Sequence, residues 1–212
     1  QNKPEAKPWK LLLWTAIAGL IFGLIGFGEI AEDTLRIGRN SLHWHKASGD
    51  IVLVKSDDQS LRDVGRWPWP RRRFAELTDR LSEAGAKRIF YDISFYSRSE
   101  PEDDRLFAEA LQRSKRVVLP VKARSGPDSG TEQDAFPLPM FARHVQGLGT
   151  ISAQYNFQNM IWRLPYSISV GDRHFRSYAA QMAGADGPAG ELFVPDYSID
   201  PDSIPAVSAR DV

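Results

Sequence analysis

Hydrophobic and polar residues follow one another along the chain in blocks that predict alternating strands and helices from residue 50 onwards. Residues 50–57, DIVLVKSD, form a short apolar block that ends in acidic residues, and this pattern predicts a buried strand. In residues 70–87, apolar side chains recur at steps of three and four from Phe74 to Ala84, which predicts an amphipathic helix. The folded part of the chain is therefore expected to begin with a strand and a helix.

The same alternation continues through the middle of the chain. Residues 88–95, RIFYDISF, predict a second strand, and residues 116–123 predict a third. Between them, residues 103–114 predict a second helix, with Asp103 as its N-cap. Because strands joined by helices of this length lie parallel and cross over in the right-handed sense, we expect a βαβαβ core with a parallel sheet.

The C-terminal part of the chain has a different pattern. A loop rich in Gly, Pro and Asp, residues 124–139, separates it from the core. Residues 148–154 and 160–170 alternate like antiparallel strands, and residues 177–184 predict a short helix. The end, residues 192–212, is rich in Pro and Asp and predicts a loop that stops before another strand. The expected fold class is α/β, a mixed sheet in which antiparallel strands extend the βαβαβ core and helices flank it.

An uncharged apolar segment precedes these elements. Residues 11–28, LLLWTAIAGLIFGLIGFG, carry no charged side chain and are about long enough to cross the roughly 30 Å hydrocarbon layer as a helix. We expect a transmembrane helix at residues 11–30, retained as an anchor because no small-x-small cleavage site follows closely. Gly19 and Gly23 have the GxxxG spacing of closely packed membrane helices, so the expected oligomer is a homodimer.

Charges on either side of this segment predict its orientation. Lysines precede it and acidic residues follow it, namely Lys3, Lys7, Lys10, Glu29, Glu32 and Asp33. By the positive-inside rule, residues 1–10 are then cytoplasmic and the remainder lies outside the cytoplasm. Between the transmembrane helix and the first strand, residues 31–49 predict a helical stalk.

The composition narrows the possible functions. Lys+Arg and Asp+Glu each number 27, so the formal net charge is zero and no global field attracts nucleic acid. The chain has no cysteine, which excludes disulfides and thiolate metal sites. The sequence also lacks a G-x-S-x-G elbow, a P-loop and an H-E-x-x-H motif. We therefore expect no metal and no cofactor, and no motif selects a reaction.

Charged residues follow the predicted strands at their carboxyl ends, where open parallel sheets bind ligands. Asp57 and Asp58 follow the first strand, and Asp92 ends the second. Arg66 and Arg71 belong to the loop and helix start beside them. One interpretation is a site for a hard cation or a phosphate group. The other is structural: the acidic residues shape turns and cap helices, and the arginines neutralise them.

The stretch RWPWPRRR, residues 66–73, is the most unusual local sequence. Pro70 suits the first turn of a helix, and residues before prolines are extended, so Trp67 and Trp69 point to opposite sides. We expect at least one tryptophan to pack inward, because two exposed tryptophans would be an aggregation risk. The arginines that follow spread over different helix faces and need acidic partners, for which Asp57, Asp58 or Asp92 are expected. This arrangement argues against nucleic-acid binding.

The run Gly65–Arg71, GRWPWPR, is the most specific of several motifs that together resemble the CHASE2 family, the extracytoplasmic sensory domains of bacterial membrane receptors. Asp57-Asp58, Asp92, the stretch DDRLFAEAL and Arg163 in WRLP are similar to the family pattern as well. The resemblance extends over residues 50–212. The family's Asp-x-Asp-Gly-like turn before the arginine reads NFQN here, at residues 156–159, which departs from the pattern.

This resemblance implies signal reception. Residues 50–212 would form a sensor domain in the periplasm that is truncated at its C-terminus and held in the bacterial inner membrane by one N-terminal helix. The domain would bind an unknown small molecule or ion and transmit to a cytoplasmic output such as a diguanylate cyclase, a phosphodiesterase or a histidine kinase. The segment itself is not expected to be an enzyme.

The ligand-binding candidates are the charged and aromatic residues of these motifs: Asp57, Asp58, Arg66, Trp67, Arg71, Asp92 and Arg163. Two further hypotheses stay open. In one, the domain is a protein-interaction or dimerisation module without a small-molecule ligand. In the other, it is a Mg²⁺-dependent hydrolase, which requires several carboxylates within reach of one metal ion.

Overall fold

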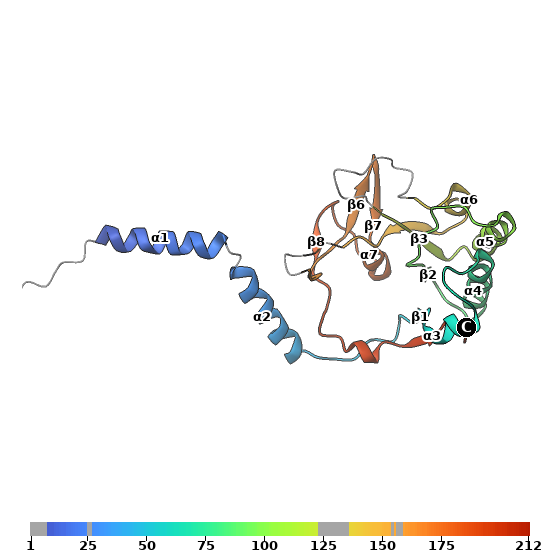
Figure 1. The fold of residues 1–212 in the computed structure, drawn as a ribbon, viewed down its shortest axis with the longest axis horizontal. Coiled ribbons are helices and arrows are strands. Elements are labelled where there is room, and N and C mark those ends of the chain that lie inside the picture. Colours follow the sequence, from blue (N-terminus) through green and yellow to red (C-terminus); the bar gives the residue numbers. More distant parts are fainter. Residues whose placement is uncertain (1–7, 25–26, 123–135, 154, 156–158) are drawn as a thin grey trace, which may run out of the picture. The chain divides into compact units, whose positions relative to one another are not determined.

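The computed structural model describes residues 8–24, 27–122, 136–153, 155 and 159–212, and its chain divides into two compact units (Figure 1). The N-terminal unit consists of residues 1–51 and 196–204, and the main unit of residues 52–195 and 205–212. Each unit is described below by itself.

The N-terminal unit contains two helices and a pair of extended segments. Helix α1 spans Pro8–Leu24 and helix α2 spans Phe27–Leu42. After α2, the chain lies beside residues 198–200: the His45 N–H donates to the Ser198 carbonyl at 3.0 Å, and the Asp200 N–H donates to the His45 carbonyl at 2.7 Å. A short 3₁₀ helix at Pro201–Ser203 follows.

The N-terminal helices differ from the sequence-based expectation. One helix was expected at residues 11–30, but α1 ends at Leu24 and α2 begins at Phe27, with residues 25–26 outside the described part. The 17 residues of α1 rise about 26 Å, which is short of the roughly 30 Å hydrocarbon layer. None of the described helices has both the length and the apolar character needed to cross a membrane. The stalk segment, residues 31–49, is helical as far as Leu42.

The main unit is built on a parallel three-stranded sheet. Strands β2 (Ile89–Phe90), β3 (Val117–Val121) and β4 (Gly147–Thr150) lie in the order β2-β3-β4. Helix α5 (Pro101–Ser114) connects β2 to β3 and packs against helix α4 (Arg71–Glu83) (Figure 1). The short helix α6 (Pro139–Ala142) precedes β4. The expected strand–helix–strand arrangement is therefore confirmed for the second and third predicted strands.

The first predicted strand does not join this sheet. Strand β1 (Leu53–Lys55) instead pairs in parallel with β9 (Ala206–Ser208), near the end of the chain. The predicted βαβαβ sheet is thus wrong in its first strand, and the predicted C-terminal loop, residues 192–212, contains two strands, at residues 192–193 and 206–208. Periodicity along the sequence identifies a strand but does not identify its partner, because pairing depends on contacts between distant residues.

The remaining strands form small antiparallel pairs. Strands β6 (Ser167–Val170) and β7 (Arg173–Arg176) make a hairpin, and β5 (Leu164–Pro165) pairs with β8 (Leu192–Phe193). Antiparallel pairing was expected for residues 160–170 and is confirmed. It was also expected for residues 148–154, but β4 is parallel to β3. The fold is a mixed α/β arrangement with parallel and antiparallel sheets.

Helix α7 (Tyr178–Ala183) packs closely on the central sheet. Ser177 is its N-cap and accepts a hydrogen bond from the Ala180 N–H at 3.2 Å. A side chain at Gly149 of β4 would place its Cβ 2.8 Å from the Tyr178 ring and 3.0 Å from the Arg176 carbonyl, and it would also collide with Gln181. Only glycine allows this close approach, so Gly149 determines where α7 lies on the sheet.

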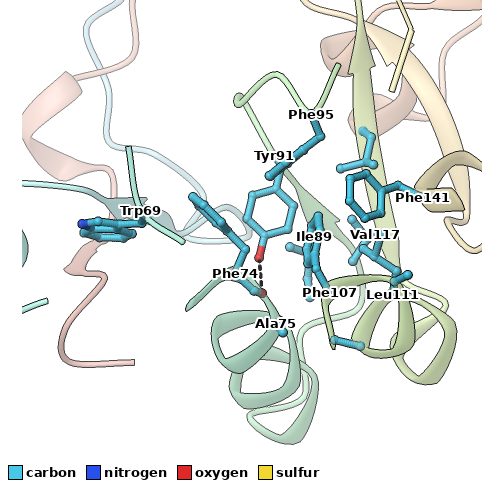
Figure 2. Packing of buried hydrophobic residues seen from close by; sticks show 13 residues of the cluster. Trp69, Phe74, Ala75, Ile89, Tyr91, Phe95, Phe107, Leu111, Val117 and Phe141 are labelled. Carbon is cyan, nitrogen blue, oxygen red and sulfur yellow. Dashed lines mark hydrogen bonds between the residues drawn. The ribbon is translucent and has the colours of Figure 1, made fainter. Parts of the chain in front are cut away.

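Aromatic side chains from α4, α5, α6 and the segment after β2 form the core of the main unit (Figure 2). The Phe107 ring lies 4.8 Å from Phe95 and 5.1 Å from Phe141, measured between centroids. Phe74 makes an edge contact with Phe95 at 5.3 Å. Most of these rings meet at steep angles, the geometry that aromatic quadrupoles favour.

The buried Tyr91 hydroxyl within this core has hydrogen-bond partners. The Tyr91 hydroxyl lies 2.9 Å from Thr78 Oγ1 and donates to the Phe74 carbonyl at 3.3 Å (Figure 2). Burial raises the pKa of Tyr91 well above its ordinary value, so the hydroxyl stays neutral. The hydroxyl therefore links α4 to the end of β2 without burying a charge.

Replacing Phe107 tests the aromatic core. Phe107→Ala should lower the free energy of unfolding by about 3–5 kcal/mol, because it removes a fully buried ring and leaves a cavity. Urea denaturation of the full chain measures the change. Tyr155→Ala, at a side chain that is 64% exposed, is the control and should change stability by no more than about 0.5 kcal/mol. Equal losses in the two variants would contradict the assignment of the core.

Candidate functional site

Asp57 and Asp58 lie at the start of helix α3 (Asp58–Asp63). Asp57 is the N-cap, and its Oδ1 accepts hydrogen bonds from the Ser60 N–H and the Ser208 hydroxyl, both at 2.9 Å. These hydrogen bonds hold the pKa of the Asp57 carboxyl below its ordinary value, and the one from the Ser60 N–H has the largest effect. Asp58 is exposed. Asp57 therefore has a structural role, because it connects α3 to β9.

The loop before α4 contains Arg66, Trp67 and Trp69. Trp69 is buried and donates from Nε1 to the Gly65 carbonyl at 2.8 Å, which confirms that one tryptophan packs inward. Trp67, which precedes a cis peptide bond to Pro68, remains 47% exposed, with its ring 5.7 Å from that of Trp69. Arg66 is exposed and makes no side-chain hydrogen bond or ion pair with any described residue.

The arginines at the start of α4 have different partners from those expected. Arg72 Nε lies 2.9 Å from Asp103 Oδ1, and Arg71 Nε lies 3.8 Å from Asp104 Oδ1. The expectation that Arg71 faces Asp57, Asp58 or Asp92 is therefore wrong. Helices α4 and α5 pack side by side, which places the acidic first turn of α5 opposite the basic first turn of α4.

Asp103 also has a different position from the one expected. It was predicted to be the N-cap of the second helix, but α5 begins two residues earlier, at Pro101, with Glu100 in the N-cap position. Proline is well suited to the first helical position because its missing N–H has no intrahelical partner there. Asp103 thus lies within the first turn, where its charge is favoured by the helix dipole.

Arg71 occupies a confined position between α4, α5 and the segment after β2. Its guanidinium carbon lies 4.6 Å from the centre of the Phe95 ring, and Nη2 donates to the Ser97 carbonyl at 3.4 Å. Burial lowers the pKa of Arg71, while the charge of Asp104 opposes this shift. The other oxygen of Asp104 accepts from the Ser99 N–H at 3.0 Å. The cluster of Arg71, Arg72, Asp103 and Asp104 is therefore largely neutralised by its own members.

Asp92 and Arg163 lie apart from this cluster. Asp92 is exposed just after β2, and its charge contributes, after burial, to raising the pKa of Tyr178. The Tyr178 hydroxyl donates to the Tyr91 carbonyl at 2.8 Å, at the carboxyl end of β2. Arg163 is exposed before β5. Consequently, the candidate residues do not converge on one site through hydrogen bonds or ion pairs among the described residues.

Two further expectations concern ion binding. Of the turn that departs from the family pattern, residues 156–158 lie outside the described residues. No group of three or more His, Asp or Glu side chains in the described ranges is arranged to hold a metal ion. The carboxylates that the hydrolase hypothesis requires are therefore not gathered in that part of the chain.

A hollow that the sequence patterns did not indicate lies at the amino ends of the strands of the central sheet, which we call the amino edge. It is lined by residues at the amino ends of the parallel strands, at the end of β7 and on α7: Arg88, Val118, Gln146, Gly147, Arg176 and Gln181. Its volume is about 170 Å³. Sequence analysis directed attention to the carboxyl ends of the strands, and no motif signals the meeting of Arg88 with Arg176.

Comparison with known proteins gives one match. A family model described as "CHASE2 domain" matches residues 12–212, which is nearly the whole chain. Neither the curated proteins nor the solved structures contain a match to this chain.

Removal of Arg71 tests whether the charge cluster is structural. Arg71→Ala should destabilise the chain by about 3 kcal/mol, because it leaves the Asp104 carboxylate, whose side chain is 4% exposed, without its cation. Arg66→Ala should change stability by no more than about 0.5 kcal/mol, since Arg66 is exposed. Thermal and urea denaturation measure both variants. If Arg71→Ala were as stable as Arg66→Ala, the cluster would not stabilise the fold.

The lowered pKa of Asp57 predicts a pH dependence. A carboxyl whose pKa is lower in the folded state stabilises the fold above its unfolded pKa of about 4, and this contribution disappears as the pH falls through the folded pKa. Asp57→Asn keeps a capping side chain but carries no charge. The wild type should therefore be more stable than Asp57→Asn at pH 7, with a gap that closes between about pH 5 and pH 2.

Urea denaturation at a series of pH values measures this gap. Asp58→Asn is the matched control, because Asp58 is the exposed neighbour at the same helix start and its substitution removes the same charge. A wild-type advantage over Asp57→Asn that stayed constant down to pH 2 would contradict the prediction.

Proposed function

The chain belongs to the CHASE2 family of extracellular sensory domains, and we propose that it is the signal-input domain of a bacterial membrane receptor. The observation that carries this proposal is the extent of the family match, which includes both the apolar N-terminal segment and the main unit. In this proposal the domain lies in the periplasm and is not itself an enzyme.

The apolar segment supports attachment to the inner membrane. Residues 11–28 carry no charge, with lysines before them and acidic residues after them. This distribution is the one expected when the N-terminus is cytoplasmic and the following domain is exported. In the proposed receptor, residues 11–30 anchor the domain and a second copy associates through the same segment.

Connectivity supports a route for the signal. Strands β1 and β9 pair in the main unit, and both are continuous with the paired segments around His45 and Ser198 in the N-terminal unit. A ligand can shift a receptor only if it binds two arrangements with unequal affinity. We propose that such a ligand changes the β1–β9 pair and thereby biases a cytoplasmic output, such as a diguanylate cyclase, a phosphodiesterase or a histidine kinase.

The predicted ligand-binding residues differ in how well the structure suits them to that role. Asp57 and Arg71 are engaged in structural contacts. Arg66, Asp92 and Arg163 are exposed and make no side-chain hydrogen bond or ion pair with described residues, so their charges are available to a ligand. These three are the members of the predicted set that we propose to test first.

One observation favours the alternative, an interaction module without a small ligand. The arginine–aspartate cluster neutralises itself, whereas apolar side chains on and next to the β1–β9 pair are exposed, namely Val52, Leu53 and Val207. Parallel strands are usually covered on both faces. A partner protein or a second copy would supply that cover.

Thermal denaturation against a panel of amino acids, carboxylates, sugars, nucleotides and divalent cations tests the sensor proposal. A ligand present at 100 times its Kd should raise the Tm by about 5–10 °C. Charge-removing variants at Asp92 and Arg163 show whether a hit uses the predicted residues. A panel without any shift, combined with concentration-dependent dimerisation in analytical ultracentrifugation, would replace the sensor proposal with the interaction module.

A further inference from the structure

The hollow at the amino edge of the central sheet is formed by side chains that also hold α7 in place. Arg88, which precedes β2, donates from Nη1 to the Gln181 carbonyl at 2.5 Å and from Nη2 to the Met182 carbonyl at 3.0 Å. These carbonyls belong to the last turn of α7, whose partial negative charge attracts a cation. Arg88 therefore has a fixed position at the rim.

Arg176 reaches the same region from the end of β7. Its Nη2 donates to the Ala180 carbonyl at 3.2 Å and to the Ala185 carbonyl at 2.5 Å, and its Nε lies 2.8 Å from Asp186 Oδ1. The Asp186 side chain is 77% exposed, so solvent screens much of this pairing. The two guanidinium groups thus give the hollow a net positive charge.

Hydrogen-bonding capacity remains at the hollow after these contacts are made. Arg88 Nε, Arg176 Nη1 and the side-chain amide of Gln146 donate to no described residue. Gln181 uses its amide nitrogen on the Leu148 and Arg176 carbonyls, at 3.1 and 3.2 Å. Its Oε1 is left as an acceptor near Gly147, where the absence of a side chain keeps the hollow open.

This arrangement specifies the chemistry of a ligand. Unused guanidinium and amide donors suit a carboxylate, which accepts several hydrogen bonds and reduces the repulsion between two arginines. The free acceptor of Gln181 requires a donor on the same molecule. The volume of about 170 Å³ is below the roughly 300 Å³ at which sites for drug-sized ligands begin, so the ligand is small.

We propose that the hollow binds a small hydroxycarboxylate, with its carboxylate facing Arg88 and Arg176 and its hydroxyl donating to Gln181 Oε1. The inference rests on the proposed sensor function and identifies a ligand class and a site for it. The site lies at the amino edge of the sheet, away from the residues predicted at the carboxyl edge. Binding there would reinforce the attachment of α7 to the sheet, because Arg88 directly precedes β2 and donates to carbonyls of α7.

Isothermal titration of the full chain with glycolate tests the proposal, with acetate, methyl glycolate and inorganic phosphate as comparison ligands. Glycolate should bind about threefold to tenfold more tightly than acetate, which lacks the hydroxyl donor. Methyl glycolate, which lacks the charge, should not bind measurably. Absence of glycolate binding, or phosphate binding as tight as that of glycolate, would overturn the proposed ligand class.

Variants locate the binding site. Arg88→Gln should weaken glycolate binding at least about tenfold, because it removes a charged donor. Arg143→Gln, at an exposed arginine that does not line the hollow, is the matched control and should leave binding unchanged. Gln146→Leu should weaken binding about threefold or more without unfolding the chain, since the Gln146 side chain makes no hydrogen bond to any described residue. This variant keeps the test decisive if Arg88→Gln fails to fold.

The outcomes separate this inference from the sensor proposal. Glycolate binding that is unchanged in both Arg88→Gln and Gln146→Leu would overturn the site. A different compound that raises the Tm, in the absence of glycolate binding, would overturn the hydroxycarboxylate proposal and leave the sensor proposal standing. Loss of glycolate binding in the hollow variants, with binding retained in Asp92→Ala, is the result that the proposal requires.

Discussion

The packing of aromatic rings between α4, α5 and the central sheet is the interaction on which the main unit depends. Phe74, Phe95, Phe107 and Phe141 are almost completely inaccessible to solvent and come from four separate segments of the chain. Each buried ring contributes a large apolar area. Their association brings α4 and α5 side by side, and this in turn places the basic first turn of one helix opposite the acidic first turn of the other.

That arrangement separates two kinds of charged residue. The arginines and aspartates at the starts of α4 and α5 neutralise one another, so they stabilise the fold and leave little charge for a ligand. Arg88 and Arg176 have main-chain carbonyls as their principal partners, and carbonyls do not cancel a full positive charge. The amino edge of the sheet therefore remains electropositive. An anion is accordingly expected there rather than at the starts of α4 and α5.

Individual residues show how far prediction from sequence extends. The apolar steps from Phe74 to Ala84 correctly indicated α4, and the tryptophan expected to pack inward is Trp69. The partners of Arg71 could not be predicted, because several acidic residues near strand ends were equally plausible and only helix packing selected Asp104. The hollow was missed for a similar reason: Arg88 and Arg176 are distant in sequence and occur in no shared motif.

The sequence by itself determined the types of most elements, the mixed α/β class and the family, because hydrophobic periodicity and the GRWPWPR motif are local properties of the chain. Tertiary structure alone decided which strands pair and which charges meet. Strand β1 pairs with β9 although most of the domain lies between them in the sequence. Such pairings follow from burying side chains that are far apart along the chain, and no local pattern encodes that contact.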